Sequence, residues 1–317
     1  MNVLRFLKNW ILPLSMIVGV VSYFIASEIP FFYENKVVVL DVVHLVQPTL
    51  IFAMLFLSFC KIDIREMRLR RWHIWLLLIQ LGLFFVLTSA AYLLPNIYHG
   101  RVVIEAAMIC IICPTATAAA VIVRKLGGSA ADVVTYTILV NLSAAIAVPL
   151  CVPLIHPQVG VGFLSASFLI VKRVFPLLLC PLFCALILRS LFPALHQFLS
   201  RCFNLSFYLW TIALALAISV TTRTIVHTTL PITYQIGIAI VSLVCCVFQF
   251  ATGKAVGRHY NDMITAGQAL GQKNTVFAIW LGFTFFTPIT SIAGGFYSIW
   301  HNVINSYQLY KNRANGD

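Results

Sequence analysis

Apolar residues run in long uninterrupted stretches along this chain, and short polar segments separate them. Each stretch is about 20 residues long, which is the length that a helix needs to cross the hydrocarbon core of a bilayer. Strands of a membrane barrel would instead alternate apolar and polar residues. The pattern therefore predicts ten helical spans, at approximately 10–28, 37–59, 73–94, 102–123, 133–154, 166–192, 204–222, 233–255, 265–286 and 288–310.

The composition supports a membrane protein. Hydrophobic residues make up 61% of the chain, charged residues only 9%, and the mean hydropathy is +0.96. A soluble domain usually carries about 25% charged residues. In lipid, every backbone polar group must be satisfied within the protein, which favours helices. We expect an all-α polytopic membrane protein, with the first apolar stretch retained as a helix because no clear signal-peptide cleavage site follows it.

The net charge of +12 does not indicate a nucleic-acid partner, because the basic residues form short clusters between the apolar spans rather than one stripe. If the N-terminus is cytoplasmic, 15 of the 21 Lys and Arg residues fall in cytoplasmic segments and 3 in external loops. Cytoplasmic loops of membrane proteins carry such an excess. We therefore expect both termini in the cytoplasm, with a bacterial inner membrane as the location.

Catalytic and metal-binding motifs are not evident. The nine cysteines lie mostly inside apolar spans, where we expect them to pack as small hydrophobes. Cys110 and Cys113 form a C-x-x-C, but no second pair or histidine follows at zinc spacing. There is no phosphate-binding loop and no nucleophile motif. We expect neither an enzyme nor a bound cofactor or metal.

Two spans are interrupted by polar residues, proline or glycine. Span 4 contains Cys113–Thr117, and span 9 contains Gly267–Thr275. Ten spans divide into two sets of five, 1–154 and 155–317, which places the two interruptions at matching positions of an inverted repeat. Transporters break helices in this way around a binding site. The simpler alternative is a proline kink in span 4 and a polar helix contact in span 9.

Four sequence features resemble the bile acid:sodium symporter family. The segments Gly271–Thr275 and Phe296–Asn302 resemble its glycine-x-glutamine-asparagine-serine crossover and its Trp-His-Asn motif. Cys113–Ala118 partly resembles the Cys-Pro crossover of the fourth helix, and Gln80 stands where the family has a glutamine in a sodium site. The resemblance extends over the whole chain in the number and order of helices.

The resemblance implies a core domain, here about 73–154 and 233–310, beside a panel domain, about 10–59 and 166–222. It implies a secondary transporter of a small or amphipathic organic anion, with crossing broken helices in the core. The candidate substrate contacts that follow are Thr115, Thr117, Asn274, Thr275, His301 and Asn302. The candidates for an ion-site or coupling position are Gln80, Thr137, Asn141, Gln272 and Lys273.

Several positions depart from the family pattern. Ala119, Ala120 and Ala269 stand where the family has polar or acidic side chains, and Lys273 stands where it has the crossover glutamine. Sodium prefers oxygen ligands, which alanine side chains lack, and an ammonium would repel the ion. We therefore expect no sodium coupling of the usual kind, although backbone carbonyls alone remain a possible sodium site.

Lys273 has three functional interpretations. It is a fixed positive charge in a vacated cation site, a titrating group that couples transport to protons, or a partner for the carboxylate of a substrate. Its cost at the bilayer centre is at least about 2.5–3.5 kcal/mol. A structural alternative is that the side chain reaches the membrane surface. For the whole protein, the alternative function is a transport-inactive ligand receptor or sensor that keeps the pocket.

Overall fold

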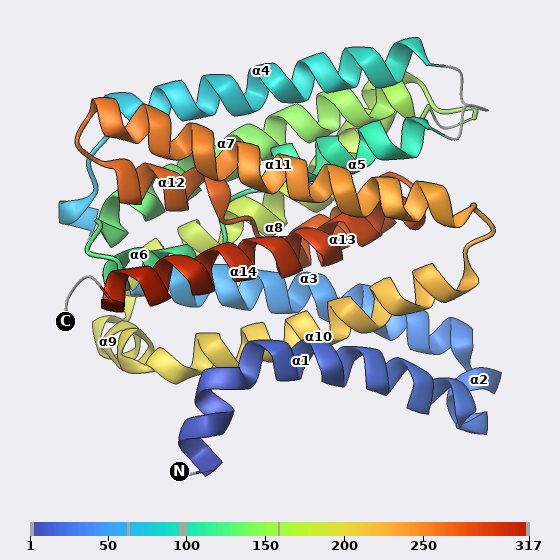
Figure 1. The fold of residues 1–317 in the computed structure, drawn as a ribbon, viewed down its shortest axis with the longest axis horizontal. Coiled ribbons are helices and arrows are strands. Elements are labelled where there is room, and N and C mark those ends of the chain that lie inside the picture. Colours follow the sequence, from blue (N-terminus) through green and yellow to red (C-terminus); the bar gives the residue numbers. More distant parts are fainter. Residues whose placement is uncertain (1–2, 62–63, 95–99, 158, 315–317) are drawn as a thin grey trace.

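The computed structural model describes residues 3–61, 64–94, 100–157 and 159–314 (Figure 1). Within these residues the regular elements are fourteen α-helices and two short 3-10 turns, which confirms the predicted all-α class. The helices are α1 (Val3–Glu28), α2 (Pro30–Glu34), α3 (Lys36–Cys60), α4 (Arg71–Leu93), α5 (Arg101–Ile112), α6 (Ala119–Lys125), α7 (Ala130–Ile155), α8 (Phe163–Leu191), α9 (Pro193–Arg201), α10 (Phe203–His227), α11 (Ile232–His259), α12 (Met263–Gly271), α13 (Thr275–Phe285) and α14 (Ile292–Ala314).

Six of these helices, namely α3, α4, α7, α8, α10 and α11, are long and apolar enough to cross a membrane. Shorter apolar helical stretches cover Leu14–Glu28 and Thr275–Phe285. Many large apolar side chains of the long helices are exposed, such as Val86 of α4 at 64% and Leu164 of α8 at 80%. These features are those of a polytopic integral membrane protein, whose outer surface is covered by lipid.

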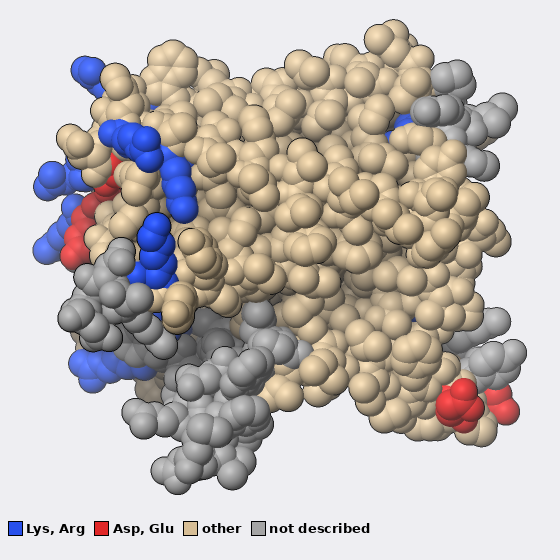
Figure 2. All heavy atoms as spheres, viewed as in Figure 1, with Lys and Arg blue, Asp and Glu red and all other residues tan. Residues whose placement is uncertain are grey.

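The long helices lie roughly parallel and form two packed groups (Figure 1). In one group α1 packs along α10, and α3 packs against α8 and α10. In the other, α11 packs against α12, α14 and α5, and α4 packs against α5 and α7. Extensive packing of α7 against α8 joins the two groups. Lys and Arg side chains gather at one end of the bundle, on the left of the space-filling view, while the middle of the visible face is free of them (Figure 2).

The expected spans 4 and 9 are each divided into two shorter helices. The first is interrupted between α5, which ends at Ile112, and α6, which begins at Ala119. The second is interrupted between α12, which ends at Gly271, and α13, which begins at Thr275. These two interruptions are the irregular backbone around which the candidate site is built.

Glycines allow α12 to lie very close to α11. A Cβ at Gly253 would lie 2.5 Å from the carbonyl oxygen of Ala266, and a Cβ at Gly257 would lie 2.6 Å from that of Asp262. Small residues four apart are a common means of bringing two membrane helices together. The turn that joins them contains Asn261 at a φ of 59°, a left-handed conformation that asparagine tolerates well. This contact fixes the position of α12 and of the interruption that follows it.

Candidate functional site at the helix crossover

Proline and an asparagine cap set two of the helix ends at the interruptions. Pro114 has no N–H, and its ring disfavours a helical conformation at the preceding residue. Cys113 accordingly has a ψ of 132° and ends α5. At the other interruption, the Asn274 side-chain oxygen accepts a hydrogen bond of 3.2 Å from the Phe277 N–H and so caps the start of α13.

The two extended segments cross and pair with each other. Thr115 and Lys273 form an antiparallel bridge. The Ala116 N–H donates to the Gln272 carbonyl at 3.0 Å, and the Asn274 N–H donates to the Pro114 carbonyl at 2.8 Å. Backbone groups that the broken helices leave unpaired are thus satisfied within the protein.

Side chains of the crossing segments strengthen this pairing. The Thr115 hydroxyl donates to the Ala269 carbonyl at 2.7 Å, which ties the first segment to the last turn of α12. The Cys113 thiol donates to the Asn274 carbonyl at 2.8 Å. Thr115, Asn274 and Thr275 are 0%, 6% and 4% exposed, respectively. These three predicted site residues therefore lie at the crossover, and the Thr115 hydroxyl is bonded across it.

Gln80 reaches the crossover from α4. Its amide Nε2 donates to the Ile112 carbonyl at 3.3 Å, at the end of α5, and its Oε1 accepts a 2.8 Å hydrogen bond from the Tyr136 hydroxyl of α7. The glutamine that the family resemblance assigns to a sodium site thus has both its oxygen and its nitrogen engaged by protein. Tyr136 was not predicted as a site residue. Its signal in the sequence is a polar hydroxyl within a mainly apolar span.

Tyr297 of α14 supports the second interruption in the same way. Its hydroxyl donates to the Gly271 carbonyl at 2.8 Å, at the end of α12, and accepts a 3.0 Å hydrogen bond from Gln249 of α11. Gln249 also donates to the Cys110 carbonyl of α5 at 3.2 Å. Neither residue was predicted as part of the site. Together they connect α5, α11, α12 and α14 around the crossover.

Lys273 is 1% exposed, and its ammonium has no hydrogen-bond partner among the described residues. It therefore does not extend to the membrane surface, which excludes that alternative. Its electrostatic neighbours are four thiols, those of Cys110, Cys113, Cys245 and Cys246. Cys110 and Cys113 belong to the last turn and the C-cap of α5, so the ammonium lies near the negative end of that helix.

His301 and Asn302 of α14 lie beside the crossover rather than in it. The His301 ring packs edge-on against the Tyr297 ring, with centroids 5.8 Å apart, and its buried Nδ1 has no hydrogen-bond partner among the described residues. The Asn302 amide donates to the Ser298 carbonyl of its own helix at 2.6 Å. His301 is thus buried against Tyr297, while the Asn302 amide is engaged by its own helix.

The remaining predicted residues occupy other positions. The Thr137 hydroxyl donates to Val133 in its own helix at 2.9 Å. Asn141 of α7 donates to the Leu178 carbonyl of α8 at 3.4 Å and so links the two packed groups of helices. Thr117 is half-buried and precedes α6, and Gln272 donates to Gln268 of α12. Of these four, the crossover includes only Gln272.

An apolar groove of about 360 Å³ lies between the two groups of helices. It separates α1 and α10 on one side from α14 on the other, and its lining includes Val21, Ile218, Thr221 and Phe296. Phe296 immediately precedes Tyr297, so the groove borders the helix that supports the crossover. Its chemistry suits a hydrocarbon group rather than an ion.

Among the described residues, no group of three or more His, Cys, Asp or Glu side chains is arranged to hold a metal ion. No protein-family model matches this chain, and no curated protein matches it. The site is therefore defined by its own geometry, in which a buried lysine amine, without a hydrogen-bond partner among the described residues, lies where two broken helices cross.

Proposed function

We propose that this protein is a secondary transporter that carries a small or amphipathic organic anion by alternating access. One observation carries the proposal. The Lys273 ammonium is buried at the crossing of two interrupted helices, with no hydrogen-bond partner among the described residues. Interrupted helices in transporters surround binding sites, and charges at membrane depth are usually functional.

The energetics favour an anionic ligand at this position. Burying an ammonium costs several kcal/mol even after the protein relaxes. The nearby negative end of α5 returns at most about 2 kcal/mol, the upper range of a helix-terminus interaction. The remaining free-energy cost of burying the ammonium is reduced when an anion such as a carboxylate binds beside Lys273. The apolar groove between α1, α10 and α14 is a separate surface that suits a hydrocarbon group.

We propose ten membrane spans in two inverted repeats of five, with the interrupted helices as the fourth and ninth spans. The panel consists of α1, α3, α8 and α10, and the core contains the other long helices with both interruptions. The pairing of α1 with α10 and the groove between these helices and α14 support this division, while α7 and α8 form the main contact across it. Transport would follow from movement of the core against the panel. The family resemblance supports the same arrangement.

Sodium is not the coupling ion in this proposal. Ala119, Ala120 and Ala269 offer no side-chain oxygen, and the two polar ends of the Gln80 amide are engaged by Tyr136 and Ile112. The Lys273 ammonium supplies the positive charge that a sodium ion would otherwise bring. When the Lys273 ammonium occupies the position of the cation, electrostatic repulsion disfavours sodium binding there.

We expect purified protein in proteoliposomes to accumulate labelled carboxylates from a panel of mono- and dicarboxylates, at the same rate in sodium and in potassium buffers. Sodium should likewise give no rise in melting temperature beyond that given by potassium or choline. Liposomes without protein are the control. Uptake or stabilisation that requires sodium would contradict the coupling proposal. Ligand binding without uptake would instead identify a receptor that has kept the pocket.

We expect both termini on the cytoplasmic side of a bacterial inner membrane. Helix α1 begins and α14 ends toward the end of the bundle where Lys and Arg gather (Figures 1 and 2). Basic loops remain on the cytoplasmic side during insertion. Reporter domains that are active only in the cytoplasm should be active when fused to either end and inactive in the segment between α4 and α5. The opposite pattern would refute this orientation.

A further inference from the structure

Helix α9 has two chemically distinct halves. At 100° per residue, Ala194, Leu195, Phe198 and Leu199 fall on one side of the helix, while His196, Gln197, Ser200 and Arg201 fall on the other. This separation is far sharper than in the long helices, which are apolar all round. The helix lies between α8 and α10, two of the candidate membrane spans.

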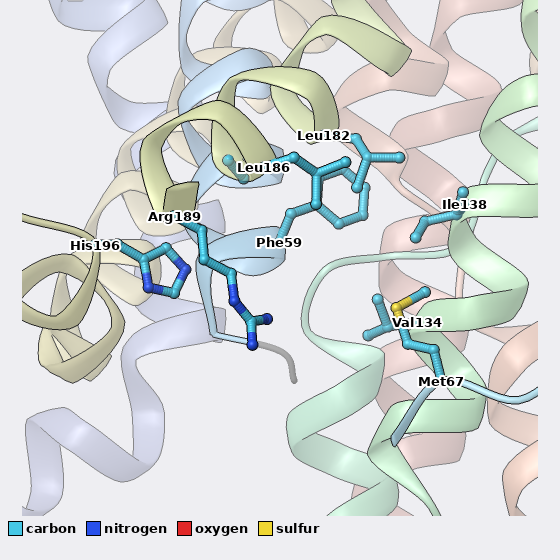
Figure 3. A pocket seen from close by; sticks show the side chains of 9 residues that line it. Phe59, Met67, Val134, Ile138, Leu182, Leu186, Arg189 and His196 are labelled. Atoms are coloured by element: carbon cyan, nitrogen blue, oxygen red, sulfur yellow. The ribbon is translucent and has the colours of Figure 1, made fainter. Parts of the chain in front are cut away.

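Most of the apolar half of α9 is exposed, with only Leu199 half-buried, and Gln197 and Arg201 on the other half are exposed as well. Phe198 is 64% exposed and Leu195 is 48% exposed, and no residue of the helix is buried. The half-buried His196 points inward, where it lines a cleft between α8, α9 and α7 together with Arg189 (Figure 3). An amphipathic helix packed on a soluble protein has the opposite orientation, with its apolar half covered by protein.

The surroundings of α9 indicate what covers this half. The helix lies at the end of the bundle where Lys and Arg gather (Figures 1 and 2). Exposed cations at this end include Arg65, Arg68, Arg124 and Lys125, and α9 itself ends at the exposed Arg201. Apolar side chains next to a layer of cations match the boundary between acyl chains and anionic headgroups.

We propose that α9 is an interfacial helix that binds anionic phospholipid. The helix lies flat in the headgroup layer, with Leu195 and Phe198 among the acyl chains and with Arg201 beside lipid phosphates. His196 faces the protein and closes the cleft beneath the helix. This surface is separate from the crossover, so its role does not depend on the proposed transport function.

Photo-cross-linking tests the orientation of α9. A benzophenone amino acid replaces Phe198 in one variant of the full chain and Gln197, on the other half of the helix, in a matched control. Both variants are reconstituted in vesicles of phosphatidylcholine and phosphatidylglycerol and irradiated. Mass spectrometry then measures the mass of the adducts on each variant. We expect phospholipid adducts at position 198 well above those at position 197. Cross-links from position 198 to a second copy of the chain, or equal lipid adducts at both positions, would overturn the proposal.

Lipid-dependent stability tests the role of the cations. In nanodiscs, adding phosphatidylglycerol to phosphatidylcholine should raise the melting temperature of the unmodified protein. The variant Arg201→Gln should lose much of that rise, whereas Arg223→Gln, near the opposite end of α10, should keep it. An equal rise in the unmodified protein and in Arg201→Gln would show that α9 does not bind anionic lipid.

Discussion

Anion binding should weaken about 30-fold or more when Lys273 is replaced by methionine or glutamine. Removing one partner of a buried charge pair costs about 2–5 kcal/mol, and 2 kcal/mol corresponds to roughly a 30-fold change in Kd. The effect is measured by titrating the best carboxylate from the transport panel and following the thermal shift. Lys125→Gln is the matched control, because it removes an exposed lysine from α6, next to the crossover.

Stability separates this effect from misfolding. In the absence of anion, Lys273→Met should melt at the same temperature as the unmodified protein or higher, because replacing a buried ion by an apolar group of similar volume is often neutral or stabilising. Loss of binding together with a large fall in melting temperature would point to a damaged fold. Unchanged anion affinity in both the methionine and the glutamine variants would show that Lys273 does not contribute to anion binding.

The arginine variant distinguishes a fixed charge from a titrating group. Arginine does not deprotonate in proteins, so Lys273→Arg keeps the charge but cannot release a proton. Burial disfavours the charged amine and the neighbouring thiols are neutral when protonated, so the described part of the site has no built-in counter-charge and the arginine variant decides between the two roles. If the larger guanidinium is accommodated, we expect Lys273→Arg to retain anion binding and uptake. Uptake that disappears while binding persists would favour proton coupling instead.

The sequence predicted six long apolar helices correctly because membrane burial leaves a strong and simple signal. Apolar stretches longer than a soluble helix requires are sufficient to locate α3, α4, α7, α8, α10 and α11. Pro114 also indicated where α5 would end, since proline removes a helical hydrogen bond and restricts the residue before it. These features depend on local chemistry, so a single sequence is enough to predict them.

The arrangement of the site depends on contacts between distant segments, which spacing alone does not reveal. The bridge between Thr115 and Lys273 requires two helices to break at the same depth and face each other. Tyr297 and Gln249 enter the site because α11 and α14 pack beside the crossover, and their sequence signal is only a polar atom in a helical span. Asn141 has the same signal but contacts α8 instead.

The close contact between α11 and α12 was not predicted from the sequence. Disturbing this contact should have a large effect on stability and on anion binding. Gly253→Ala should lower the melting temperature by several degrees and abolish anion binding. The added Cβ would lie 2.5 Å from the Ala266 carbonyl oxygen and 2.9 Å from the Gly267 Cα, both of which belong to the backbone. Because backbone atoms cannot rotate away, α12 must move, at a cost of about 1–3 kcal/mol or more for overpacking.

Gly82→Ala in α4 is the matched control, because a Cβ there meets nothing within 4 Å. Alanine favours a helix over glycine by about 1 kcal/mol, so this variant should be neutral or slightly stabilised. The same substitution should therefore change stability in opposite directions at the two positions. Anion binding should fail only in Gly253→Ala, since displacement of α12 also displaces the segment that carries Lys273. Equal melting temperatures and equal anion affinities for the two variants would mean that the α11–α12 contact does not position the crossover.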